Sequence, residues 1–165
     1  MTLPARRPAL LGTIAVLSLA GLAVTTYLSI VYLADSAPAC GLSSGCETVA
    51  NSRFARLFGI PVPIPGALMY AALLMGSLAL AGFERRDLRV ERAMLLLSVI
   101  GVAFSAYLTA ASVFVLHATC QWCLASAALV TVILPLTVLV AFLRDVPASS
   151  PEDRRATSCA LPPAV

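Results

Sequence analysis

Long apolar runs separated by short polar segments are the main pattern along this chain. Four runs lack Asp, Glu, Lys and Arg, and they are Ala9–Leu33, Gly66–Phe83, Ala93–Leu116 and Gln121–Leu143. Their lengths are near or above the roughly 20 residues that cross a bilayer as a helix. Because lipid offers no hydrogen-bond partners to the backbone, single segments that cross it form helices. The pattern predicts an all-α membrane protein, a bundle of four transmembrane helices.

The composition agrees with a membrane location. Of 165 residues, 60% are hydrophobic and 12% are charged, and the mean hydropathy is +0.95, which is far more apolar than a soluble domain. We expect a short cytoplasmic N-terminus over residues 1–8, a single membrane domain over residues 9–143, and a disordered cytoplasmic tail over residues 144–165. The tail is rich in Pro, Ser and Ala with mixed charges, a composition that cannot form a core.

The arginines predict the orientation, since the chain has no lysine. Nine of the eleven arginines precede the first span, separate the second from the third, or follow the fourth. Four spans place these three regions on one side, which the positive-inside rule makes the cytoplasm. Only Arg53 and Arg56 fall on the far side. The net charge of +3 is therefore a topology signal, and we expect no nucleic-acid partner.

The first outer connection, residues 34–65, is long and carries two cysteines, Cys40 and Cys46. Within it, the apolar residues of Glu47–Phe58 recur at helical spacing, with the arginines away from them. We therefore expect a short interfacial helix lying on the membrane surface. Pro61 follows this segment and cannot continue a helix.

A second cysteine pair, Cys120 and Cys123, opens the fourth predicted helix in a C-x-x-C motif. The two sulfurs lie three residues apart on one helix face. The free N–H groups and the positive dipole end of the first helical turn stabilise a thiolate there. Such a pair forms a reactive disulfide where a lipid-soluble oxidant can reach it.

Cys40 and Cys46 form the other predicted pair, in a glycine-containing loop on the outer side, where disulfides persist. Together the pairs suggest an electron relay from a substrate dithiol through Cys40 and Cys46 to Cys120 and Cys123, and then to a membrane acceptor. Two alternatives remain: purely structural disulfides in a non-catalytic membrane protein, and a four-cysteine zinc site. The C-x5-C spacing departs from that of zinc sites, and we expect no metal.

Several of these residues together resemble the vitamin K epoxide reductase family in its bacterial form. The resemblance covers roughly residues 10–143 and rests on the two cysteine pairs in order, on Ser52 between them, and on Gly59-Ile60-Pro61 and Gly66. It implies a four-helix bundle around a quinone, capped by the loop helix. Animal members carry a tyrosine four residues after the second C-x-x-C cysteine, where this chain has Ala127. The resemblance therefore favours quinone reduction over epoxide reduction.

The resemblance also implies roles for the four cysteines. Cys40 exchanges with a separate extracytoplasmic thioredoxin-fold thiol oxidase, Cys46 attacks the C-x-x-C at Cys120, and Cys123 faces the quinone. The acceptor is a quinone of the menaquinone, ubiquinone or phylloquinone (vitamin K) type. The protein then supports disulfide bond formation from a bacterial cytoplasmic membrane, with its active site facing outside.

Candidate quinone contacts lie near the outer membrane edge. The serine that the family carries in the loop corresponds to Ser52, which is expected to hydrogen-bond a quinone oxygen. Aromatic residues at the same level are the other candidates, although aromatic belts occur at any membrane interface. These aromatic candidates are Phe54, Phe58, Tyr70 and Trp122.

Overall fold

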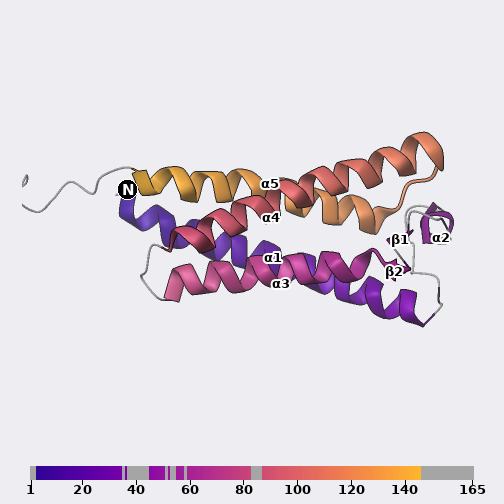
Figure 1. The fold of residues 1–165 in the computed structure, drawn as a ribbon, viewed down its shortest axis with the longest axis horizontal. Coiled ribbons are helices and arrows are strands. Elements are labelled where there is room, and N and C mark those ends of the chain that lie inside the picture. Colours follow the sequence, from indigo (N-terminus) through magenta and orange to yellow (C-terminus); the bar gives the residue numbers. More distant parts are fainter. Residues whose placement is uncertain are drawn as a thin grey trace, which may run out of the picture.

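The protein is a bundle of four long helices. The computed structural model describes residues 3–34, 36, 45–50, 52, 55–57, 59–82 and 87–145. The long helices are α1 (Leu3–Leu33), α3 (Pro63–Gly82), α4 (Leu88–Ala110) and α5 (Gln121–Asp145), and they lie lengthwise beside one another (Figure 1). Within the described residues, all four are long and apolar enough to cross a membrane. The predicted four-helix membrane fold is confirmed.

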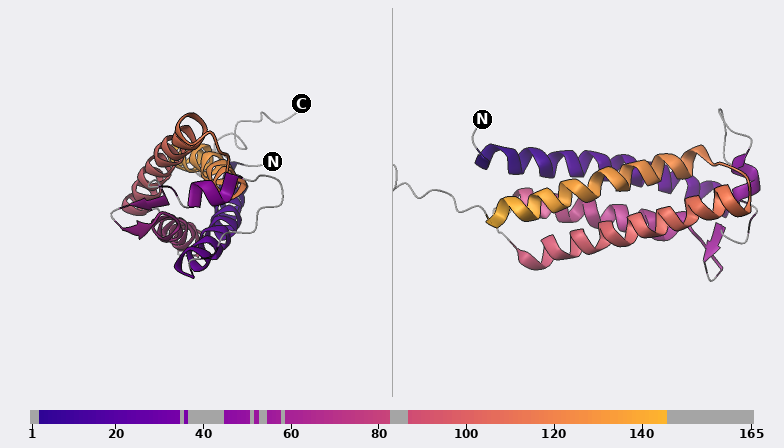
Figure 2. Two further views of the ribbon diagram at one scale, coloured as in Figure 1. Left: turned by 90° about the vertical axis from the view of Figure 1, so that its right-hand side faces the viewer. Right: turned by 90° about the horizontal axis from the view of Figure 1, so that it is seen from above.

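The helices follow the order α1, α3, α4, α5 around the bundle. α1 packs against α3 and α5, and α4 packs against the same two, so α1 and α4 lie diagonally opposite (Figure 2). α1 begins and α5 ends at the same end of the bundle. We call this the arginine end because Arg7 lies there, and we call the opposite end, where α5 begins, the cysteine end.

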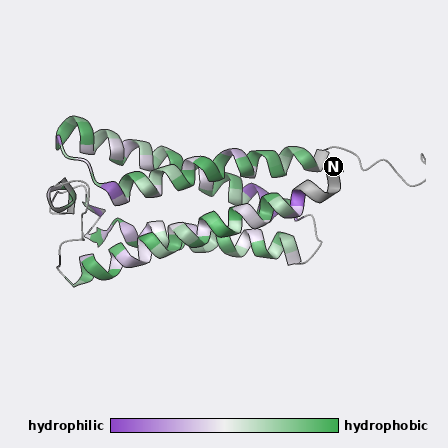
Figure 3. Ribbon diagram, turned by 180° about the vertical axis from the view of Figure 1, so that it is seen from behind, coloured by the Kyte–Doolittle hydropathy of each residue, from purple (hydrophilic) through white to green (hydrophobic). Residues whose placement is uncertain are grey.

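The core runs along the bundle axis and is small. It is formed by a stripe from each helix: Leu11, Ile14, Tyr70, Leu73, Leu80, Met94, Val130, Ile133 and Val140. Many large apolar residues, among them Val16, Leu68 and Phe142, are instead exposed on the outside. Figure 3 shows hydrophobic residues along the whole length of the helices. An outer surface of this kind requires lipid around it, because exposure of so large an apolar surface to water is unfavourable.

Buried hydroxyls interrupt the apolar core. Ser77, Ser98 and Thr137 are buried, and each donates its hydroxyl hydrogen to a backbone carbonyl of its own helix at 2.7–2.8 Å. This local bonding satisfies a polar group without a partner on another helix. Such small residues let the helices approach closely.

The cysteine end is closed by a short segment between α1 and α3. It contains helix α2 (Gly45–Ala50) and two strands, β1 (Arg56–Leu57) and β2 (Ile60–Pro61), which pair antiparallel. Gly59 lies in the turn between the strands with a φ of +84°, a conformation that favours glycine. The prediction of a helix over Glu47–Phe58 is therefore wrong at Arg56–Leu57, which this turn pairs as a strand.

α1, α3 and α4 begin earlier than the apolar pattern indicates, whereas α5 begins at Gln121 as predicted. α3 begins at Pro63 rather than Gly66, since proline is well tolerated in the first turn of a helix. α4 begins at Leu88, and the carboxylate of Asp87 caps it by accepting the N–H of Arg89 at 2.9 Å. As a result, Glu91 lies inside the helix rather than in the connection before it.

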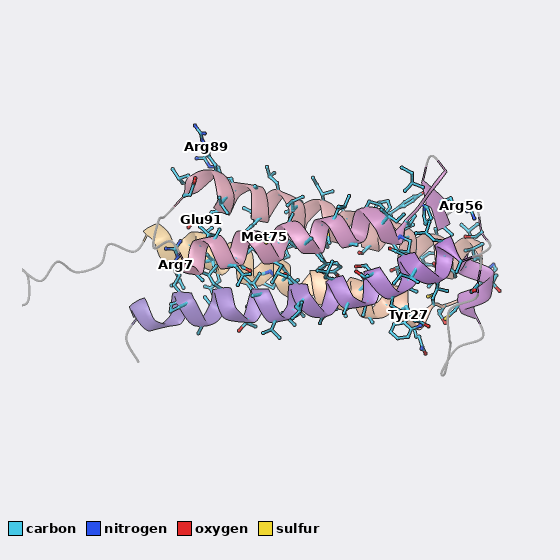
Figure 4. All side chains as sticks on the ribbon, turned by 90° about the horizontal axis from the view of Figure 1, so that it is seen from below. Arg7, Tyr27, Arg56, Met75, Arg89 and Glu91 are labelled. Carbon is cyan, nitrogen blue, oxygen red and sulfur yellow. The ribbon has the colours of Figure 1, made fainter. Side chains whose placement is uncertain are left out.

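An ion pair crosses the bundle at the arginine end. Arg7 on α1 donates a hydrogen bond to the carboxylate of Glu91 on α4, and the two side chains point toward one another (Figure 4). The Glu91 side chain is only 4% exposed. The pair therefore connects the two diagonally opposed helices.

Candidate redox site

The C-x-x-C motif lies at the junction between an extended segment and α5. Cys120 immediately precedes the helix and Cys123 lies in its first turn. A residue in this position faces the free backbone N–H groups that begin a helix. Both cysteines are free thiols; Cys120 is 3% exposed and Cys123 is half-buried.

Hydrogen bonds stabilise the thiolate of Cys120. The Cys123 side chain donates to its sulfur, and the backbone N–H groups of Cys123 and Trp122 donate as well. These donors lower the pKa of Cys120 to about 6, although burial acts in the opposite direction. At neutral pH Cys120 is therefore a thiolate, the form that attacks disulfides and reduces acceptors.

Cys46 of α2 lies against this motif. It is disulfide-bonded and 1% exposed, and its partner is neither Cys120 nor Cys123, which are free. Cys46, Val49 and Cys120 form one buried cluster, with Trp122 and Cys123 packed against it. The fold thus brings the second loop cysteine and the C-x-x-C motif together although more than 70 positions separate them in the sequence. Cys40 lies outside the described residues.

A cavity of about 530 Å³ opens below this cluster, inside the half of the bundle that carries the cysteines. Its wall includes Cys123, Trp122, Tyr32 and Tyr70, together with apolar residues of α3 and α4 such as Met69 and Phe104. Pockets of this size and apolar character hold small organic ligands. A flat aromatic ligand can therefore lie against the sulfur of Cys123.

Two of the predicted ligand contacts line this cavity. Tyr70 is 1% exposed, and its hydroxyl donates to the backbone carbonyl of Ser126 at 2.8 Å. Trp122 also lines the cavity, and its ring packs against that of Tyr27 at a centroid distance of 5.3 Å. The Tyr27 contact orients the indole between the cysteine cluster and the cavity.

The remaining predicted contacts are placed differently. The Ser52 hydroxyl donates to the carbonyl of Val49 at 2.7 Å, and Ser52 is not among the residues that line the cavity. Phe54 and Phe58 lie outside the described residues. In the part of the chain that the structure describes, no three His, Cys, Asp or Glu side chains are grouped to hold a metal ion.

Two features of the structure were missed by the sequence reasoning, although a signal existed for both. Tyr32 lines the cavity, and it continues the inward stripe of α1 that runs through Gly21, Thr25 and Leu28 at spacings of three and four residues. Glu91 likewise begins the buried stripe of α4. Glu91 lies just before the apolar run Ala93–Leu116, whereas Tyr32 lies inside the run Ala9–Leu33 and follows from the spacing alone.

Buried thiols at the end of a membrane-helix bundle, next to an apolar cavity, define a membrane protein of thiol–disulfide chemistry. Comparison with protein families identifies the family: the model of the vitamin K epoxide reductase family matches residues 13–138. The chain therefore belongs to the vitamin K epoxide reductase family, and its membership implies oxidoreductase activity. Comparison with curated proteins found no match.

Proposed function

We propose that this protein is a quinone-dependent thiol–disulfide oxidoreductase. It oxidises a separate thioredoxin-fold partner through Cys40 and Cys46, passes the electrons to Cys120 and Cys123, and reduces a membrane quinone. The observation that carries the proposal is the burial of Cys46 and Cys120 in one cluster with Cys123 on the wall of the adjoining cavity. That order matches the order of the proposed transfers.

The transfers between the cysteine pairs are two disulfide exchanges. After the partner has reduced the loop pair, the Cys46 thiolate attacks the Cys120–Cys123 disulfide at Cys120 and releases Cys123. Cys40 then attacks the mixed disulfide, which re-forms Cys40–Cys46 and leaves Cys120 and Cys123 reduced. The low pKa of Cys120 makes the C-x-x-C pair reactive near neutral pH.

The cavity supports a quinone as the final acceptor. Its wall is mostly apolar, and it includes Leu68 and Ile100, which are also exposed on the outer surface of the bundle. A hydrophobic ring can bind inside while its tail remains in lipid. Menaquinone, ubiquinone and phylloquinone share this form, and the reaction transfers two electrons from the two thiols to the ring.

The distribution of arginines supports a location in a bacterial cytoplasmic membrane, with the arginine end inside and the cysteine end outside. Arg7, Arg89 and Arg92 lie at the arginine end, whereas Arg56 lies at the cysteine end with β1. Disulfide formation in exported proteins requires this orientation, because the cytoplasm keeps thiols reduced.

A single-turnover reaction tests the proposal. Purified protein in detergent is fully reduced, freed of reductant and mixed with a short-chain quinone, while quinone absorbance and free thiols are followed. One quinone lost for each pair of catalytic thiols is expected for the wild type and for the control Cys159→Ala, which changes the fifth cysteine, in the predicted cytoplasmic tail. None is expected for Cys123→Ala. Quinone reduction that persists in Cys123→Ala would contradict the relay.

The alternative is a non-catalytic membrane protein in which the same buried disulfide of Cys46 is purely structural. Equilibration in buffers of defined redox potential separates the two. A disulfide that exchanges with a mild dithiol buffer supports the relay, because structural disulfides resist such reduction. A protein that neither exchanges nor reduces quinone is a structural one.

A further inference from the structure

The proposed reaction leaves one proton without a source. Reduction of a quinone to a hydroquinone takes up two electrons and two protons. The reduced C-x-x-C pair supplies both electrons, but near neutral pH it carries only one proton, which is on Cys123, since Cys120 is a thiolate. A second proton donor must therefore reach the cavity.

Several hydroxyls on the cavity wall already donate hydrogen bonds to backbone carbonyls. Thr25 donates to the carbonyl of Gly21 at 2.8 Å, and Ser112 donates to that of Leu108 at 2.8 Å. The Tyr70 hydroxyl donates to the carbonyl of Ser126. Each would have to break a buried hydrogen bond before it could donate to a ligand.

Tyr32 is different. It lies one residue before the end of α1, lines the cavity, and is close enough to the sulfurs of Cys123 and Cys120 to interact electrostatically with both. These two cysteines are the titratable groups, among the described residues, that act on its hydroxyl. No described residue forms a hydrogen bond with this hydroxyl. A phenol is also a stronger acid than the aliphatic hydroxyls of Ser105 and Thr109, which line the same cavity.

We propose that Tyr32 is a catalytic residue that donates the second proton to the quinone, at the ring oxygen that does not take the proton of Cys123. This inference rests on the proposed quinone reduction and assigns one step of it. Tyr32 and Cys123 both line this cavity, so a quinone that contacts Cys123 shares the cavity with the Tyr32 side chain.

The step balances. Cys120 as thiolate and Cys123 as thiol lose two electrons and form the Cys120–Cys123 disulfide, with loss of the Cys123 proton to one quinone oxygen. The O–H bond of Tyr32 breaks, and its proton goes to the other electron-rich oxygen of the ring. One negative charge is present before the step, on Cys120, and one after it, on Tyr32. The phenolate then takes a proton from the water at the cysteine end of the bundle.

The test compares Tyr32→Phe with the matched control Tyr107→Phe in the single-turnover reaction. Tyr107 is 58% exposed on α4 and does not line the cavity. General acids contribute on the order of 100-fold to rates, so Tyr32→Phe is expected to slow quinone reduction by about that factor while Tyr107→Phe does not. Disulfide exchange of Tyr32→Phe with a dithiol buffer should match the wild type, which shows that its cysteines are still in place.

The pH profile gives a readout that a purely structural role does not move. Between about pH 7 and pH 8.5 the wild-type single-turnover rate is expected to be flat, because tyrosine keeps its proton in this range. In Tyr32→Phe the rate should fall as the pH rises, since the second proton then comes from solution. A wild-type rate that falls tenfold per pH unit would overturn the proposal even if Tyr32→Phe did not fold.

The remaining outcomes are also distinct. Equal rates in Tyr32→Phe and Tyr107→Phe would remove Tyr32 from the mechanism and leave the proposed function intact. A wild type that reduces no quinone would overturn the proposed function itself, and with it the role of Tyr32.

Discussion

At the scale of single residues, the protonation of Cys120 decides when the protein is reactive. Its folded pKa of about 6 lies below the usual thiol value, so the thiolate population rises as the pH rises from about 5 to 7 and is complete above that range. We expect the ultraviolet thiolate absorbance of the reduced protein to increase with a midpoint near 6. Cys123→Ala removes the first of the stabilising hydrogen bonds and should move the midpoint to higher pH.

The controls for this titration use the same chain. Cys120→Ala should abolish the transition, whereas Cys159→Ala should leave it unchanged. A midpoint that stays in the ordinary thiol range of roughly 8 to 9 in the wild type would mean that the helix start does not stabilise this thiolate.

The residue scale also shows what sequence can predict of the site. The C-x-x-C motif and the start of a helix at Gln121 together predict a stabilised thiolate, because both depend only on local sequence. The meeting of Cys46 with Cys120 depends on how α2 folds over the bundle end, and local sequence does not contain it. The family resemblance implied that contact, whereas neither the local motif nor the resemblance predicted a role for Tyr32.

At the scale of elements, the packing of α1 against α3 depends on Gly21. A Cβ atom at this position would lie 2.3 Å from Cε1 of Tyr70, whose buried ring would have to shift from the position in which its hydroxyl bonds Ser126. We expect Gly21→Ala to destabilise the protein by about 1–3 kcal/mol through overpacking, measured as thermal unfolding in detergent. Gly12→Ala, on the same helix with nothing within 4 Å of the added atom, is the matched control.

An equal effect of both substitutions would contradict this account, because it would reflect the loss of helix flexibility rather than the contact with Tyr70. Since Tyr70 also lines the cavity, Gly21→Ala should in addition weaken quinone binding in the single-turnover reaction. Gly12→Ala should leave that binding unchanged.

The elements show where hydropathy succeeds and where it does not. It predicts the four membrane helices because a bilayer imposes length and apolarity on any crossing segment. It does not predict the strand pair of Arg56–Leu57 with Ile60–Pro61, since two-residue strands carry no periodicity and depend on the turn at Gly59. The starts of α3 and α4 are misplaced for a similar reason, because Pro63 in the first turn of α3 and the Asp87 cap of α4 are local features outside the apolar runs.

At the scale of the whole molecule, the Arg7–Glu91 ion pair connects diagonal helices that otherwise touch little. Glu91→Ala takes the carboxylate away from the Arg7 guanidinium, which is only 19% exposed, and breaking a buried ion pair in this way costs about 3–5 kcal/mol in comparable sites. We therefore expect Glu91→Ala to lower the thermal stability strongly. Arg92→Ala, which removes an exposed charge from the same helix, should change the free energy of unfolding by no more than about 0.5 kcal/mol.

The double variant provides the discriminating comparison. Arg7→Ala with Glu91→Ala should be less destabilised than the sum of the two single variants, because no unpaired charge remains. Additive losses would show that the two residues act separately and that the bundle does not depend on their pairing.

The burial of Cys46 and Cys120 also determines which molecules can exchange electrons with this protein. The two residues are 1% and 3% exposed, so small thiols in solution reach them more slowly than they would reach exposed cysteines. On the proposed function, a folded partner that fits the cysteine end would therefore exchange electrons with this protein faster than small thiols do. On the same proposal, the supply of oxidised quinone would set how long the protein can keep oxidising that partner.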